Sequence, residues 1–156
     1  METICGTVKY DLIHESGEFI RIKRKTDMAE IVFKEESYKI IGSCMKVHQV
    51  LGFGFLESVY QEALARQFHI DEIPFEQEKM INVYYNNKKL DKYFKADFLC
   101  FDKIIVELKA KPFIHQDNIE QTRNYLKSTN LQLGLLVNFG EKSLTYKRVL
   151  NSYNSY

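Results

Sequence analysis

The chain has 156 residues, of which 45% are hydrophobic and 28% charged, with a formal net charge of +1. This composition indicates one ordinary globular domain and argues against a strongly basic protein that coats nucleic acid without specificity, although it leaves room for a local basic surface. No apolar run approaches the roughly 18 residues of a membrane span, and the N-terminus lacks a signal-peptide pattern. The three cysteines, Cys5, Cys44 and Cys100, form no C-x-x-C pair. We therefore expect neither a disulfide framework nor a zinc site, and a reducing, cytoplasmic setting without membrane contact.

Two short strand patterns, 7–13 and 18–25, precede the rest of the chain. They predict an N-terminal extension over residues 1–28 in the form of a β-hairpin, followed by a main domain over residues 29–156.

The main domain then alternates between helical and strand patterns. Asn86-Asn87 predicts a turn between two strands, and Lys111-Pro112 ends a buried strand because proline cannot continue the ladder. The expected helices cover residues 35–50, 55–68 and 114–127, and the expected strands cover 80–85, 90–101, 104–110, 133–139 and 144–150.

Helical spacing of apolar residues indicates which side of each helix faces the sheet. The core order of helix, three strands, helix and two strands predicts an α/β fold in which helices flank a mixed central β-sheet. The stripes expected to face the sheet contain Tyr38, Ile41, Met45 and His48 in the first helix, and Tyr60, Ala63 and Leu64 in the second.

Charged residues interrupt the most apolar predicted strand. Glu107 and Lys109 lie two residues apart within the strand over 104–110, so their side chains share one face. Asp97 lies ten residues before Glu107, near the end of the preceding strand. Burying such charges is costly unless they are paired with opposite charges or used in a functional site. Two carboxylates and a lysine converging at strand ends suit metal-assisted phosphodiester cleavage, because carboxylates hold a hard divalent cation and a lysine can stabilise the transition state.

This D-x9-E-x-K pattern resembles the PD-(D/E)XK nuclease superfamily. The stretch from Gly54 to Tyr60 also has the pattern G-x-x-E-x-x-Y, and together these motifs resemble the bacterial GxxExxY family, with a match from about Ile31 to Val149. Ala96 stands where the superfamily has the proline of its name, which makes no metal contact. The stretches that carry the resemblance are 38–42, 47–48, 51–52, 54–60, 62–64, 96–99, 106–110, Gln121, 124–126 and 134–140.

The resemblance implies a PD-(D/E)XK restriction-endonuclease-like fold and a nuclease that depends on Mg²⁺ or Mn²⁺. Asp97, Glu107, Glu57 and the backbone carbonyl of Leu108 would bind the metal, and Lys109 would be catalytic together with Asp97 and Glu107. The expected partner is nucleic acid, DNA rather than RNA. A homodimer is also compatible with the sequence.

Further residues are expected near the site, and two of them also have an alternative explanation. Gln121 and Tyr125 share a helix face and are predicted to bind substrate, although Gln121 also fits a surface amide. His48 and Tyr60 are accessory candidates, and His48 fits a hydrogen-bonded core histidine better than it fits a ligand.

The buried charged residues can also be explained without catalysis. Glu57 and Lys109 could form a buried ion pair, and Lys109 alone could extend to solvent. A nuclease fold that only binds nucleic acid or a protein partner is the main functional alternative, and a structural salt-bridge network is another.

The hairpin between the two motif strands gives a geometric test. A two-residue turn at Asp102-Lys103 would set Asp97 and Glu107 on opposite faces of the sheet, because one residue of register moves a side chain to the other face. A shared metal therefore requires a three-residue connection such as 101–103, or a β-bulge near Asp97.

Overall fold

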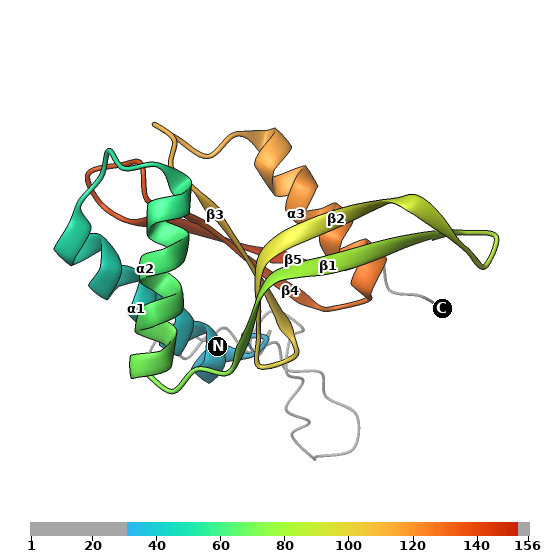
Figure 1. Cartoon of the computed structure of the whole chain (residues 1–156), viewed down its shortest axis with the longest axis horizontal. Helices are drawn as coiled ribbons and strands as arrows, with labels where there is room; N and C mark the ends of the chain where they lie inside the picture. The colour runs from blue at the N-terminus through green and yellow to red at the C-terminus, as the bar shows by residue number, and fades with distance from the viewer. Residues whose placement is uncertain (1–30, 153–156) are drawn as a thin grey trace, which may run out of the picture. The chain divides into compact units, whose positions relative to one another are not determined.

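The computed structural model describes residues 31–152, so the predicted hairpin over 1–28 lies outside the described residues. No helix among these residues is long and apolar enough to cross a membrane. In chain order the elements are α1 (Lys34–Leu51), α2 (Glu57–Ile70), β1 (Phe75–Tyr85), β2 (Lys88–Cys100), β3 (Ile104–Lys109), α3 (Gln116–Thr129), β4 (Leu133–Asn138) and β5 (Thr145–Leu150) (Figure 1).

The five strands form one mixed sheet in the order β1-β2-β3-β4-β5. Only β3 and β4 are parallel, because α3 connects them, and the other neighbouring pairs are antiparallel. All six residues of β3 and all six of β4 are buried, which agrees with their near-continuous apolar sequences. The predicted α/β fold with a mixed sheet flanked by helices is confirmed.

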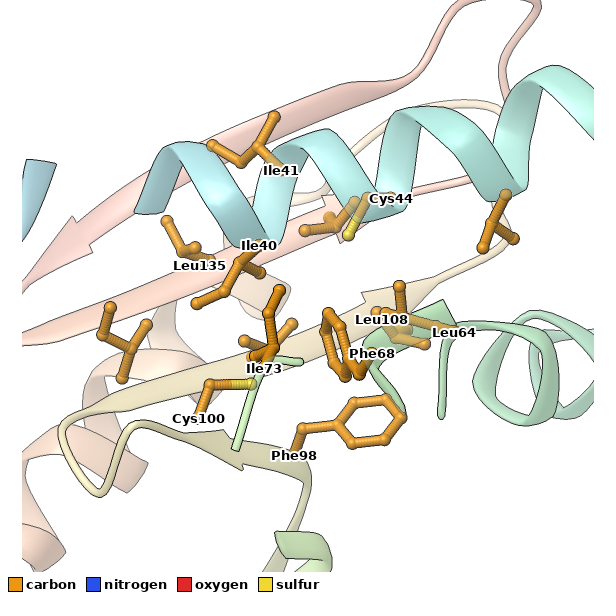
Figure 2. Packing of buried hydrophobic residues seen from close by; sticks show 14 of the residues in the cluster. Ile40, Ile41, Cys44, Leu64, Phe68, Ile73, Phe98, Cys100, Leu108 and Leu135 are labelled. Atoms are coloured by element: carbon orange, nitrogen blue, oxygen red, sulfur yellow. The ribbon is translucent and has the colours of Figure 1, made fainter. Parts of the chain in front are cut away.

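Each face of the sheet has its own hydrophobic core. One core lies between the sheet and α1 with α2, where Ile40 and Cys44 of α1 and Leu64 and Phe68 of α2 pack with Leu108 of β3 (Figure 2). The other core lies between the sheet and α3 and contains the following buried residues: Ile81, Ala96, Leu99, Ile105, Tyr125, Leu126, Leu136 and Val149. The strands thus divide their side chains between two helical layers.

The stripe predicted for α1 is partly wrong. Tyr38 is 57% exposed and Met45 is 50% exposed, whereas Ile41 and His48 are buried as expected. The buried face is rotated away from Tyr38 and Met45 and contains smaller residues, among them Cys44. The thiols of Cys44 and Cys100 are both free and buried, and burial raises the pKa of each well above its ordinary value.

A close approach of α3 to the sheet occurs at Gly134 of β4. A methyl group at this position would lie 2.5 Å from Cγ2 of Thr122 in α3. Glycine therefore lets α3 sit directly on β4, and this contact fixes the position of the helix that also contains Gln121 and Tyr125.

The hairpin of β1 and β2 extends beyond the rest of the sheet (Figure 1). The two strands pair with each other along their length, but β2 pairs with β3 only from Phe98 to Cys100. Asn86 and Asn87 form the predicted turn. Their φ angles are 47° and 60°, and a two-residue hairpin turn of type I′ requires positive φ at both positions. We call residues 79–95 the ribbon.

Candidate active site

The connection between β2 and β3 is the three-residue type, one of the two arrangements that the metal-site hypothesis allows. Cys100 pairs with Ile104 and Phe98 pairs with Val106, which leaves residues 101–103 as the turn. Phe101 and Asp102 have φ of 54° and 56°, and the chain therefore turns through two left-handed residues. One further step of this register sets Asp97 opposite Glu107, on the same face of the sheet. The prediction from parity is confirmed.

Asp97 lies at the fork where β2 leaves β3. Its Oδ2 accepts a hydrogen bond of 2.7 Å from the backbone N–H of Leu108. The carboxylate therefore replaces the backbone carbonyl that would accept this bond if the pairing of β2 with β3 continued. Its Oδ1 accepts a bond of 3.0 Å from Nε2 of Gln61 in α2. The carboxylate is therefore fixed from two sides.

Glu107 and Lys109 form a buried ion pair beside Asp97. Nζ of Lys109 donates to Oε1 of Glu107 at 2.9 Å, and the two residues are only 8% and 4% exposed. The backbone N–H of Asp97 donates to Oε2 of Glu107 at 3.5 Å. A strand places these three groups together because alternate residues of β3 share a face and Asp97 is directly across.

The electrostatic balance of the cluster is negative. Burial, followed by the charge of Asp97, raises the pKa of Glu107 to about 7. Burial also raises the pKa of Asp97, with a further rise from the charge of Glu57. Burial alone would lower the pKa of Lys109, but the charge of Glu107 and its hydrogen bond outweigh that effect and raise it. Three carboxylates thus surround one ammonium group, and the site favours an additional positive charge.

Tyr125 of α3 lies close enough to this cluster to feel the charges of Glu107 and Asp97, and Gln121, on the same helix face, forms a hydrogen bond with Tyr125. Tyr125 is buried, and its hydroxyl donates to the backbone carbonyl of Lys95 at 3.5 Å. Burial, followed by the charges of Glu107 and Asp97, raises the pKa of Tyr125, while a hydrogen bond from Gln121 opposes the rise. The phenol therefore stays protonated and polar beside the carboxylates. Its predicted role in substrate binding remains a prediction.

Glu57 begins α2 and is half-buried. It acts on Asp97 and Lys109 through its charge, but makes no hydrogen bond or ion pair with them within the described residues. Within residues 31–152 no three His, Cys, Asp or Glu side chains are placed to hold a metal ion. The structure brings Asp97, Glu107 and Lys109 together, and the role of Glu57 as a third ligand stays a prediction.

His48 and Tyr60, the two accessory candidates, hold loop backbone. Nε2 of His48 lies 2.9 Å from the carbonyl oxygen of Glu141. The hydroxyl of Tyr60 donates to the carbonyl of Gly52 at 2.7 Å, and its ring stacks on Phe139 with centroids 4.7 Å apart. These contacts match the alternative that His48 is a hydrogen-bonded core histidine.

Gln61 is a site residue that the sequence analysis missed. It lies four residues after Glu57 in α2, and residues at this spacing share a helix face. That spacing was the available signal, but an uncharged amide on an amphipathic helix has no burial cost that would single it out. Only the contact with Asp97 does so.

The charge of Asp97 should control the proton on Glu107. We expect Asp97→Asn to lower the pKa of Glu107 from about 7 toward its ordinary range, because the substitution removes the largest charge effect while burial remains. A pH titration of the Glu107 carboxyl carbon by NMR measures this, with Asp91→Asn on the exposed ribbon as the matched control. An unchanged pKa in Asp97→Asn would contradict the coupling.

The same pKa has a consequence for stability. The pKa of Glu107 is above its ordinary value of 4.5, so the folded chain binds this proton more tightly than the unfolded chain. The contribution of Glu107 to the free energy of unfolding is therefore fully present below pH 4.5 and is lost as the pH rises through about 7.

Comparisons with known proteins agree with this geometry. A family model described as the PD-(D/E)XK nuclease superfamily matches residues 34–149. Among solved structures, the crystal structure of SSO0001 matches with a TM-score of 0.50 and 14% identity, covering 62% of this chain and 50% of that one. The chain thus spans about half the length of that protein, and the likeness concerns the fold. No curated protein sequence matches the chain.

Proposed function

Because the chain belongs to the PD-(D/E)XK nuclease superfamily, we propose that it hydrolyses phosphodiester bonds of nucleic acid, DNA rather than RNA, with Mg²⁺ or Mn²⁺ as cofactor. The observation that carries the proposal is the juxtaposition of Asp97, Glu107 and Lys109 at the fork between β2 and β3. The G-x-x-E-x-x-Y stretch from Gly54 to Tyr60 supports a finer placement in the GxxExxY family.

The donor set fits a hard divalent cation. Asp97 and Glu107 offer carboxylate oxygens, which Mg²⁺ and Mn²⁺ prefer, and each oxygen retains lone pairs beyond its present hydrogen bond. We assign the cation to these two residues, with the Leu108 carbonyl and Glu57 as further ligands. When bound, a cation of this kind polarises phosphate oxygens and acidifies a bound water.

Lys109 supplies the fixed positive charge of the site. It is held by Glu107 in a largely buried position, where an ammonium group interacts more strongly than it would in water. We propose that Lys109 orients the attacking water and stabilises the charge that develops on the phosphate as the new P–O bond forms and the old one breaks. Gln121 and Tyr125 position the substrate strand.

Cleavage of a panel of duplex DNA, single-stranded DNA, flap DNA and RNA tests the proposal. We expect cleavage of DNA with Mg²⁺ or Mn²⁺, none with EDTA, and a loss in Asp97→Asn. Asparagine can still accept the Leu108 hydrogen bond, so the variant removes charge and not the fork. Calorimetric titration should show Mn²⁺ binding that Glu107→Gln abolishes.

Other outcomes identify the alternatives. A chain that binds nucleic acid but cleaves nothing is the inactive binding module. A chain that binds neither Mn²⁺ nor nucleic acid uses these charges as a salt-bridge network, and the proposed function is then wrong.

A further inference from the structure

The ribbon concentrates positive charge on a nearly neutral chain. Residues 79–95 contain the five lysines Lys79, Lys88, Lys89, Lys92 and Lys95 against the one acid Asp91, which is a charge of 5 − 1 = +4, whereas the whole chain has +1. At the base of the ribbon, Lys79 pairs with Glu76 and Lys95 pairs with Glu78.

The outer lysines are different. Lys88, Lys89 and Lys92 are exposed and make no ion pair within residues 31–152. The unneutralised charge of the ribbon is thus at its outer part, where three lysines and Asp91 leave 3 − 1 = +2, and this part projects beyond the other strands (Figure 1).

Exposed tyrosines stand opposite these lysines. Tyr84 pairs across the hairpin with Lys89, and Tyr85 pairs with Lys88. The two tyrosines are 62% and 68% exposed. Directly opposite residues share a face and successive residues alternate, so each face of the tip carries one tyrosine and one lysine.

Protection of a free strand edge explains only half of this pattern. Exposed lysines discourage pairing with other chains, but exposed aromatic residues increase that hazard. The pattern fits instead a binding partner, because each face carries an aromatic ring beside a lysine. Such a partner would have anionic groups on both sides and an apolar or stacking surface between them.

We propose that the ribbon docks the protein on duplex DNA by entering the major groove. The proposal deepens the proposed nuclease function and rests on it for its relevance to catalysis. A groove has a phosphate backbone on each side, which matches charge on both faces, whereas a single strand would meet one face. The major groove of B-form DNA is about 12 Å wide and admits a two-stranded ribbon, while that of A-form RNA is too narrow.

The ribbon also has a defined relation to the site. Asp97 lies on β2, the strand that runs inward from Lys88, and nine residues of extended strand span about 30 Å. That distance corresponds to roughly nine base pairs at the rise of B-form DNA. The tip can therefore contact the duplex at most about nine base pairs from the bond held at Asp97, Glu107 and Lys109, a limit reached when the ribbon runs along the duplex axis.

Binding is measured on the full chain in EDTA, so that cleavage does not interfere, with a 20-base-pair DNA duplex, the same sequence single-stranded, and an RNA duplex. The test variant is Lys88→Gln/Lys89→Gln. The matched control is Lys142→Gln/Lys147→Gln, which removes one exposed lysine of β5, at the opposite edge of the sheet, and one of the loop that precedes β5.

We expect the ribbon variant to bind the DNA duplex at least about tenfold more weakly and to lower the slope of log K against log salt by about 2. The control should keep parental binding, and both variants should unfold at the parental temperature. Equal losses in ribbon and control variants, no loss in either, or no DNA binding by the parent overturn the docking role. Equal effects on single-stranded DNA or RNA duplex overturn the assignment to the major groove.

Cleavage separates this proposal from the proposed function. If binding depends on the ribbon but no metal-dependent cleavage occurs, the ribbon assignment is supported and the proposed nuclease function is wrong. If the ribbon variant shows normal metal-dependent cleavage at low DNA concentration, the nuclease function is supported and the docking role of the ribbon is wrong.

Discussion

Replacing Lys109 by alanine is expected to slow metal-dependent cleavage about 10²–10³-fold, the usual effect of losing one group that stabilises transition-state charge. The fold should change little. Lys109 lowers the pKa of Glu107, so its removal raises that pKa further and lets Glu107 take up a proton instead of leaving a buried charge alone. Rates on duplex DNA and thermal unfolding measure the two effects.

A second variant distinguishes charge from packing. Lys109→Met keeps most of the buried stem and removes the ammonium group, so it should be as slow as alanine and at least as stable. Cleavage at the parental rate by Lys109→Met would show that the lysine serves the fold. The catalytic assignment would then be lost even if Lys109→Ala were inactive.

Gly140→Ala is expected to lower the free energy of unfolding by about 3 kcal/mol, at the upper end of the usual cost of overpacking. A methyl group at Gly140 would overlap the backbone of Lys111, and backbone cannot move aside as a side chain can. The buried amide of Asn138 holds the same segment, because it accepts from the N–H of Lys111 and donates to its carbonyl. Urea denaturation measures the change.

Gly42→Ala is the matched control for this substitution. Gly42 lies inside α1 with nothing within 4 Å of a methyl group at its position. Alanine there should raise the free energy of unfolding by about 0.5–1 kcal/mol, since glycine is the poorer helix former. Equal effects of both substitutions would contradict the close contact at Gly140.

The strands and the motif triad could be predicted because their signals are local. β3 is apolar apart from Glu107 and Lys109, so these two charges are conspicuous, and parity limited the connection to a three-residue turn, which the structure contains, or a β-bulge near Asp97. The faces of α1 were less predictable. Tyr38 and Met45 fit helical spacing, but the sheet accepts the smaller Cys44 in that layer and leaves them exposed.

The participation of Gln61 could not be predicted from sequence, for a different reason. Its contact with Asp97 joins residues 36 positions apart and depends on how α2 lies on the sheet. An amide has no charge whose burial would be costly, so nothing in its own sequence context marks it. The position of Glu57 depends on the same packing, which explains why the pattern could suggest a third ligand without fixing its distance.

The turn at residues 101–103 bears on how distant relatives should be recognised. Asp97 and Glu107 face each other because three residues of β2 and three of β3 separate them from the turn on either side, and the turn itself adds only length. A homologue could lengthen this turn freely and keep its acids opposed, although its spacing would no longer be D-x9-E. A residue inserted on one side only would separate them. Equal arm lengths, rather than a fixed interval between the acids, are therefore the property that a search pattern for this hairpin should encode.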